Sequence, residues 1–457
     1  MHYFVPVQPS RLSLSPSSVV LELVLASHTL SMKLTSKLDI LKIRSASNEE
    51  ESANNLEVGN AKDTDDIDEL DNQGQSILMG IISQLRLGAD LSKISLPTFI
   101  LEKKSMLERI TNIFQIPQIL LQADDTSDDV DRFLLMTKWY LASWHIAPNA
   151  VKKPLNPILG ELYNCYWDDL SDGSSAYYVA EQVSHHPPKS AYFYIVPERQ
   201  IRVDGTIVPK SKFLGNSSAA VMEGWGQVHL GSRDESYLMS QPNVYCRGIL
   251  FGKLRYELGD NMVVKCPKLN LEATIEFKVK GLLSGVYDAI EGKVINTSNG
   301  DHLYSISGKW NDIMEIKNVK TGVKKVFFDT HSSSVIRPKV RPPSEQLGRE
   351  SNKLWGPTID ALSVRDHELA TAEKAKVESE QRHVAKKRTE KGEEYLPRLF
   401  KKNITPELVE GPEYVLYKDF DFSLDPKTIE HLLFKMMPFL PGQPFEDDFD
   451  TLASEKS

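Results

Sequence analysis

The chain has 457 residues, of which 40% are hydrophobic and 26% charged, so it is long enough to bury a large core and has the composition of a globular protein. Its 54 basic and 63 acidic residues give a net charge of −9, which argues against a protein whose whole surface binds nucleic acid. The three cysteines, Cys165, Cys246 and Cys266, form no CxxC pair, so we expect neither a disulfide framework nor a cysteine zinc site, and the cytosol is the expected compartment.

The N-terminal 73 residues differ in composition from the rest of the chain. Residues 49–73 hold ten acidic residues and one base, Lys62, so this segment alone accounts for the net charge of −9. Low hydrophobicity with charge of one sign cannot bury enough surface to offset chain entropy, which predicts a disordered extension over residues 1–73. The apolar stretch 19–25 is interrupted by Glu22 and is much shorter than the roughly 20 residues of a spanning helix. We therefore expect neither a signal peptide nor a transmembrane anchor.

Helical patterns follow the acidic segment. Apolar residues recur at helical spacing over residues 77–85, with Ser76 as a candidate N-cap and Gly88 just beyond the end. This short amphipathic helix is either a core helix or a movable lid that faces a membrane, and the pattern alone leaves both interpretations open. Further helices are predicted over residues 105–114 and 129–144.

Between residues 159 and 330 the hydrophobic period changes to two. Many short strand-like segments without alternating long helices predict a large antiparallel sheet or barrel, with turn signals at residues 203–205 and 298–300. Helical composition returns over residues 364–388, before an irregular tail that is acidic over residues 446–450. The clearest strand-like segments are 191–196, 201–208, 244–258, 273–280, 302–309 and 313–317.

The most conspicuous local motif is the pair His185 and His186, followed by Pro187 and Pro188. Adjacent side chains in a regular strand point to opposite faces, and the prolines remove ladder donors, so we expect this segment to leave the sheet at a rim. Such a pair could bind a metal ion, bind an anion or form a surface turn. No HExxH motif or cysteine pair supplies the further ligands that a zinc site needs.

Two other segments carry charge near constrained backbone. Residues 152–161 place Asn156 between two prolines and beside Lys153, which on its own reads as a helix-to-strand connection. Lys374, Glu378 and Arg382 are spaced i, i+4 and i+8, so they share one face of the predicted helix. By default this face is a solvated ion-pair ladder, in which each pair contributes a few tenths of a kcal/mol, on the order of 0.3–0.5.

Signatures of catalysis are missing from the sequence. It has no GxSxG elbow and no GxxxxGK[ST] loop, and Gly224 and Gly226 stand without the rest of a dinucleotide fingerprint. We therefore predict no catalytic residue, no metal site and no cofactor.

The three motifs together resemble the oxysterol-binding-protein-related lipid-transfer proteins. Residues 181–188 read EQVSHHPP, the signature octapeptide of that family, while KKPLNPILGE at residues 152–161 and the set on the 364–388 helix resemble its other two headgroup segments. The resemblance covers about residues 77–402. Residues 82–112, 136–148 and 201–220 look most like the short yeast homologues, which exchange phosphatidylserine for phosphatidylinositol 4-phosphate, and sterol-carrying members resemble these stretches less closely.

The resemblance implies an α+β fold. Its centre is a large incomplete antiparallel β-barrel that encloses an apolar lipid tunnel, with an N-terminal helical lid and a C-terminal helical region. The implied domains are the extension 1–73, the lid 74–97, a helical part 98–150, the barrel 151–335, a C-terminal helical subdomain 336–440 and an acidic tail 441–457. We find no pleckstrin-homology or ankyrin segment of the long members.

The resemblance also implies the site residues. Those carried over for the phosphoinositide headgroup are Lys153, Asn156, His185, His186, Lys374, Glu378 and Arg382. Those carried over for phosphatidylserine are Leu96, Lys153, Asn156 and Ser211. The implied ligands are thus phosphatidylserine and phosphatidylinositol 4-phosphate, and no nucleic acid is expected.

Physical chemistry agrees with these roles. A diacyl lipid has on the order of 30 CH₂ groups, and exposing them to water costs about 24 kcal/mol at roughly 0.8 kcal/mol each. A soluble carrier must therefore enclose the tails, which favours the lid interpretation of residues 77–85. A phosphate needs several converging cations, because one exposed ion pair contributes under about 1 kcal/mol. We also hypothesise that the acidic segment repels anionic leaflets and shortens residence on them.

The function implied is non-enzymatic exchange of phosphatidylserine for phosphatidylinositol 4-phosphate between the endoplasmic reticulum and the plasma membrane. The protein would be cytoplasmic and peripheral at contacts between these membranes, touching anionic bilayers transiently, with an endoplasmic reticulum tether protein as a candidate partner. The alternatives are a sterol/phosphatidylinositol 4-phosphate exchanger, a lipid sensor without net transport, and a hydrolase using His185 or His186 as base. The hydrolase lacks a recognisable nucleophile.

Overall fold

A computed structural model of the chain describes residues 98–147, 151–249, 254–281, 285–403 and 410–444. The chain divides into the units Met1–Ala61 and Lys62–Ser457, and every described residue belongs to the second. The predicted N-terminal extension, the lid over residues 74–97 with Leu96, and residues 445–457 of the predicted acidic tail lie outside the described residues.

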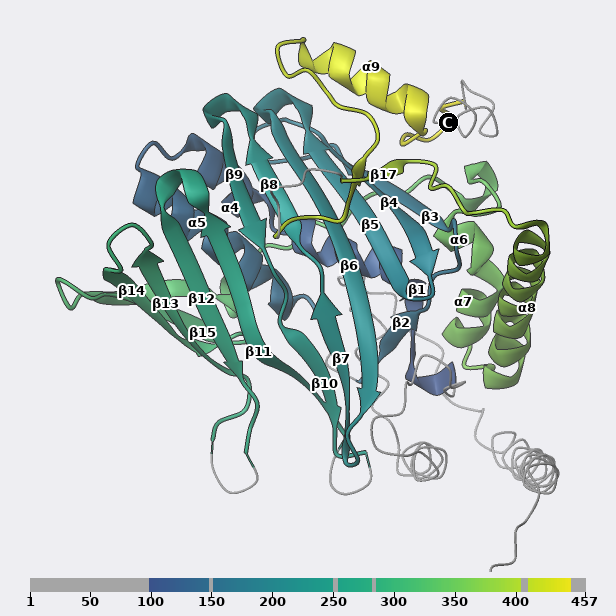
Figure 1. Cartoon of the computed structure of the whole chain (residues 1–457), viewed down its shortest axis with the longest axis horizontal. Helices are drawn as coiled ribbons and strands as arrows, with labels where there is room; N and C mark the ends of the chain where they lie inside the picture. Colours follow the sequence, from purple (N-terminus) through teal and green to yellow (C-terminus); the bar gives the residue numbers. More distant parts are fainter. Residues whose placement is uncertain (1–97, 148–150, 250–253, 282–284, 404–409, 445–457) are drawn as a thin grey trace, which may run out of the picture. The chain divides into compact units, whose positions relative to one another are not determined.

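The described chain is built around one antiparallel sheet of fourteen strands (Figure 1). The strands are β3 (Leu162–Trp167), β4 (Ala176–His185), β5 (Pro188–Val196), β6 (Ile201–Phe213), β7 (Ser217–Glu223), β8 (Gly226–Leu230), β9 (Glu235–Met239), β10 (Asn243–Arg247), β11 (Arg255–Cys266), β12 (Leu271–Lys278), β13 (Ala289–Asn296), β14 (His302–Lys309), β15 (Ile313–Asn318) and β16 (Lys324–Asp329). Along the main path their order is β16-β15-β14-β13-β12-β11-β10-β7-β6-β5-β4-β3.

Two of the fourteen strands, β8 and β9, lie beside this path and pair with each other. β7 and β8 pair one after the other along β6, while β10 and β9 pair along β11. The end strands β3 and β16 do not pair with each other within the described residues, so the sheet is an incomplete barrel, as the family resemblance implied. None of the described helices is both long and apolar enough to cross a membrane.

Because neighbouring strands are antiparallel, each connection lies at one of the two ends of the sheet. The β4–β5 turn with His186 lies at the same end as the start of β3, the end of β6 and the start of β11, because Leu162 pairs with Glu181 and Ser190 pairs with Ile207. We call this the histidine end. At this end residues 152–161 lead into β3, and the two histidines join β4 to β5.

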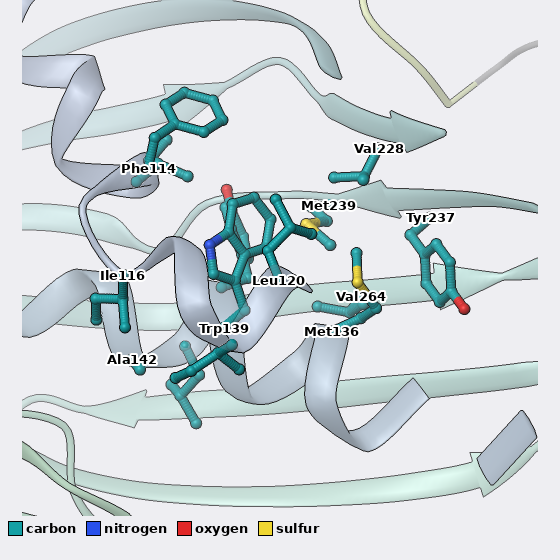
Figure 2. Close-up of a cluster of buried hydrophobic side chains, with 14 of the residues drawn as sticks. Phe114, Ile116, Leu120, Met136, Trp139, Ala142, Val228, Tyr237, Met239 and Val264 are labelled. Carbon is teal, nitrogen blue, oxygen red and sulfur yellow. The ribbon is translucent and has the colours of Figure 1, made fainter. Parts of the chain in front are cut away.

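Helices from the N-terminal part cover the inner face of the sheet. They are α3 (Met106–Arg109), α4 (Pro117–Asp125) and α5 (Asp129–Ala142), with 3₁₀ turns at Ile110–Phe114 and Ser143–His145. α3 begins at the N-cap Ser105 and α5 at Asp128, whose side chain accepts from two backbone N–H groups of the first turn. Figure 2 shows Trp139 of α5 packed with Phe114 and Leu120, facing strand residues such as Met239.

C-terminal elements cover the outer face and one side. The hairpin β17 (Phe400–Lys402) and β18 (Tyr414–Leu416), together with α9 (Pro426–Met436), packs on the outer face of β3–β5. α6 (Ser351–Leu354), α7 (Gly356–Ser363) and α8 (His367–Lys391) lie beside the parallel pair β1 (Leu101–Ser105) and β2 (Lys153–Leu155) (Figure 1). α8 begins and ends three residues later than the predicted 364–388 helix, because Asp366 is its N-cap.

Two local predictions are wrong. Residues 203–205 form no turn but lie within β6. Position 205 requires glycine because a Cβ there would overlap the ring of Tyr192. Residues 244–258 form not one strand but β10 and β11, which pair antiparallel through Val244 and Leu258. The apolar alternation continues across both strands because both present side chains to the same inner face. The turn at residues 298–300 is confirmed, since it joins β13 to β14.

Candidate functional site

The two histidines lie in the turn that joins β4 to β5. His185 ends β4 opposite Pro188, and the His186–Pro187 peptide bond is cis. The Ser184 hydroxyl donates to the Pro187 carbonyl at 2.7 Å, and the Gln182 amide donates to the Ser184 carbonyl at 2.8 Å. The segment therefore leaves the sheet at its end, as predicted, in a turn that its own polar side chains fix.

His185 is half-buried and meets all three predicted segments. Its ring centroid is 4.6 Å from that of His186, and it lies near the Pro157 carbonyl and the Glu378 carboxylate. Burial, with a further contribution from His186, lowers the pKa of His185 despite these two groups. Its buried Nδ1 makes no hydrogen bond among the described residues. The lowered pKa favours the neutral ring, in which the buried Nδ1 has no partner among the described residues.

The second predicted segment lies against this turn. Lys153 begins β2 and is exposed, as is Asn156. The segment closes on β4, because Gly160 N donates to the Gln182 carbonyl and Gln182 N donates to the Glu161 carbonyl. The segment is therefore fixed to the strand that carries His185.

Glu161, the last residue of that segment, is completely buried. Its carboxylate accepts hydrogen bonds from Ser105, Ser351 at 2.7 Å, Ile158 N at 3.0 Å and the Trp355 indole at 3.0 Å. Burial raises the pKa of Glu161, and these four donors oppose that rise. Glu161 thus joins β1 and α6 to the predicted headgroup segment, and it has no direct access to a ligand.

α8 supplies the third predicted segment. Lys374 and Glu378 form an ion pair at 2.5 Å, while the Arg382 guanidinium donates to the Ser379 hydroxyl at 2.9 Å. Gln381, on the inward face of the helix, accepts from Leu159 N at 3.1 Å. The lysine–glutamate half of the predicted ladder is therefore formed, and the helix contacts the 152–161 segment directly.

A cavity of about 580 Å³ opens beside the histidine turn. Of the predicted headgroup residues, His185, His186 and Arg382 line it, while Glu378 faces His185 and pairs with Lys374. The described lining does not include Lys153 or Asn156. It does include three residues that the sequence analysis missed, Arg349, Arg388 and Tyr395. Nothing in their local sequence marks them, because contacts with segments far away in the chain bring them to the cavity.

Ser211, predicted to contact phosphatidylserine, lies elsewhere at the histidine end. It is half-buried near the end of β6, in register with Ala220 of β7, which in turn pairs with Val244 of β10. Val244 packs against the inner core cluster, so this row of side chains faces the interior of the barrel. The structure therefore separates Ser211, on the inner wall, from the cavity beside α8.

The chemistry of the cavity is that of binding. Within the described residues, no group of three or more His, Cys, Asp or Glu side chains could hold a metal ion. The cavity lining gathers imidazole, guanidinium and lysine groups, which donate hydrogen bonds to phosphate oxygens, and it also includes the four glutamates Glu380, Glu393, Glu394 and Glu413. An anionic headgroup fits the donors at the histidine turn, His185, His186 and Arg382.

We predict that His185 makes the stability of the fold depend on pH. Its pKa is lowered in the folded state, whereas an unfolded histidine titrates near its ordinary value of about 6.5. Between these values the unfolded chain binds more protons, so the free energy of unfolding should fall as the pH falls below about 6.5. Urea unfolding at pH 7.5, 6.0 and 5.0 should show a smaller loss in His185→Gln than in the wild type. An equal loss in both proteins would contradict the prediction, and exposed His302→Gln is the matched control.

The chain is similar in sequence to known proteins over most of its length. The sequence model of the oxysterol-binding protein family matches residues 80–423. The oxysterol-binding protein-like protein OBPa of Candida albicans is 59% identical over 430 residues, which cover 93% of this chain and 99% of that protein. Oxysterol-binding protein homologs 6 and 7 of Saccharomyces cerevisiae are each 54% identical, over 86% and 84% of this chain and 88% of each homolog.

Solved structures show the same fold. The Osh1 ORD domain in complex with cholesterol matches with a TM-score of 0.63 and 23% identity, over 79% of this chain and 90% of that domain. The Osh3 ORD of Saccharomyces cerevisiae in complex with PI(4)P matches with a TM-score of 0.55 and 19% identity, over 74% and 90% of the two chains.

Proposed function

The chain belongs to the oxysterol-binding protein family, and we propose that it exchanges phosphatidylserine for phosphatidylinositol 4-phosphate between the endoplasmic reticulum and the plasma membrane. Exchange requires that two lipids use one protein in turn, with the phosphorylated headgroup held at the histidine end. The protein would act without catalysing a reaction, as a peripheral carrier whose endoplasmic reticulum tether is a candidate partner.

The observation that carries this proposal is the meeting of three separate segments at the histidine end. His185 bonds to the Pro157 carbonyl and interacts electrostatically with Glu378, so one side chain interacts with both the 152–161 segment and α8. Two histidines and Arg382 then line a single cavity. A converging set of donors is what a phosphate monoester requires, because single exposed pairs contribute under about 1 kcal/mol.

The inner wall of the barrel supports a place for the lipid tails. β10 is hydrogen-bonded along both edges, yet every one of its residues is only half-buried. By contrast, β3 is buried along its whole length. The wall near Ser211, Ala220 and Val244 is therefore less covered by protein than the part of the sheet formed by β3. The proposed tunnel runs along this part of the wall.

The choice of phosphatidylserine over sterol rests on sequence. The solved likenesses include the Osh1 ORD domain with cholesterol, but at 23% identity they show the fold alone. The resemblance to the short yeast homologues over residues 201–220 includes Ser211, which supports phosphatidylserine. A sterol exchanger with the same phosphoinositide site is the rival proposal.

A two-liposome assay tests the proposed function. Donor vesicles contain phosphatidylserine and acceptor vesicles contain phosphatidylinositol 4-phosphate, and each lipid is followed by its own fluorescent sensor. We expect phosphatidylserine to move faster when the acceptor contains the phosphoinositide than when it contains phosphatidylinositol. Absence of this acceleration, or ergosterol instead of phosphatidylserine in the mass spectrum of co-purified lipid, would contradict the proposal.

A further inference from the structure

Tyr395 lies where the C-terminal end of α8 meets the signature segment. Its hydroxyl donates to Glu181 Oε1 at 2.6 Å, and Glu181 is completely buried at the first position of that segment. The same carboxylate accepts from Arg398 N and Leu399 N, each at 2.8 Å. Burial and the neighbouring carboxylate raise the pKa of Tyr395, so the hydroxyl stays protonated and remains a donor. Glu181 thus fixes the segment that follows α8 onto β4.

Tyr395 also contacts the other two headgroup segments. A Cβ at Gly160 would lie 2.8 Å from the Tyr395 hydroxyl oxygen, so only glycine lets the 152–161 segment approach this closely, and Gly160 also has a φ of +75°. The Arg388 guanidinium of α8 lies 5.4 Å from the centre of the Tyr395 ring, within the range of a cation–π contact. Tyr395 therefore touches all three segments at one point.

α8 depends on such contacts for its placement. Of its 25 residues, all of them described, Ala370 near the N-terminal end is the one that is fully buried. The C-terminal half is held through half-buried polar side chains, of which Gln381 contacts Leu159 and Arg388 contacts Tyr395. With so little apolar burial, the distance between Arg382 and the histidine turn is set by a few specific contacts.

We infer that Tyr395 is a positioning residue for the phosphorylated headgroup, which it orients indirectly by fixing α8 against the histidine turn. The inference rests on the proposed function, because it concerns the same cavity. Tyr395 lines that cavity together with His185, His186 and Arg382. Its effect should be larger for the phosphoinositide, because Arg382 is on α8, whereas Lys153 and Asn156, which are proposed for both lipids, and Ser211 are not.

The test is Tyr395→Phe, which removes the donor to Glu181 and keeps the ring against Gly160. We expect the concentration of phosphatidylinositol 4-phosphate liposomes needed for half-maximal extraction to rise about five-fold, with an unchanged plateau, since one charge-assisted hydrogen bond is lost outside the ligand. Extraction of phosphatidylserine should change by less than about two-fold. A merely structural role would lower both extractions together.

Tyr177→Phe is the matched control. Tyr177 lies on the same strand, four residues before Glu181, and its hydroxyl donates to Glu430 of α9, far from the cavity in the fold. Both variants lose one tyrosine–glutamate hydrogen bond between β4 and a C-terminal element. We expect similar shifts in thermal unfolding midpoint, but a weaker phosphoinositide interaction in Tyr395→Phe alone.

A second variant keeps the inference testable if Tyr395→Phe fails to fold. Arg388→Gln removes the cation over the Tyr395 ring from a largely exposed helix and should raise the half-maximal concentration about two- to three-fold. If the wild type extracts phosphatidylinositol 4-phosphate and both folded variants need the same half-maximal concentration as the wild type, the inference is overturned. The proposed function would then remain intact. A wild type that extracts no phosphatidylinositol 4-phosphate would instead refute the proposed function.

Discussion

Replacing both histidines of the β4–β5 turn, His185→Ala with His186→Ala, should abolish extraction of phosphatidylinositol 4-phosphate while the protein stays folded. The exposed His186 can donate a hydrogen bond to phosphate, whereas His185, whose ring bonds to the Pro157 carbonyl, can donate a second one from Nδ1 only when a bound phosphate holds the ring protonated. Each such charge-assisted bond is worth about 1.5–3 kcal/mol, so losing two should weaken binding by at least about 100-fold. The fold should survive, because His186 is exposed and the buried Nδ1 of His185 bonds to no described residue. Liposome extraction followed by mass spectrometry, with circular dichroism as the folding check, measures both effects.

The control for this double variant is His302→Ala with His331→Ala, which removes two exposed histidines outside the cavity. It should extract the phosphoinositide as the wild type does. In the double variant of the turn, phosphatidylserine should still enter the protein, but its transfer should no longer accelerate when phosphoinositide is added. Normal phosphoinositide extraction by the variant without His185 and His186 would contradict their proposed role in headgroup binding.

A second large effect is expected on the inner wall of the barrel. Ala220→Trp places an indole at the centre of the row formed by Ser211, Ala220 and Val244, where the wall is half-exposed. If lipid tails occupy this space, the indole should prevent extraction of both phosphatidylserine and phosphatidylinositol 4-phosphate. The variant should remain folded, because the added ring enters space that the protein itself leaves uncovered.

Val221→Trp gives a control one residue away. Alternation along β7 places Val221 on the outer face, in register with Lys210, whose side chain pairs with the exposed Glu223. An indole there should leave extraction of both lipids within about two-fold of the wild type. Equal activity of the two variants in liposome extraction would contradict the proposed path of the tails.

Local sequence predicted those features that depend on nearest neighbours along the chain. The hydrophobic period of two predicted the sheet. The apolar spacing over residues 129–144 predicted the helical segment formed by α5 and the 3₁₀ turn that follows it. The prolines after His186 correctly predicted that the histidines leave the sheet at its end. The spacing of Lys374 and Glu378 likewise predicted a pair on one helical face, and the two side chains do pair.

Features that depend on distant residues were not predictable in this way. Gly205 looks like a turn glycine beside Asp204, but it is a packing glycine because the ring of Tyr192 lies across it. Glu181 and Glu161 look like members of binding motifs, yet both carboxylates are buried and hold structural elements together. Their partners lie far along the chain, as Tyr395 does from Glu181, so no local pattern contains them.

The sequence by itself determined the family and the antiparallel character of the sheet, because both follow from spacing and residue type, and its motifs carry the proposal for the headgroup residues. It also placed the whole net charge in residues 49–73. Only the tertiary structure decided which motif residues line the cavity and which are buried and hold elements together. It also brought Arg349, Arg388 and Tyr395 into the cavity lining. The physical reason is that burial and hydrogen-bond partners are set by long-range contacts, which appear only when the strands and α8 have packed together.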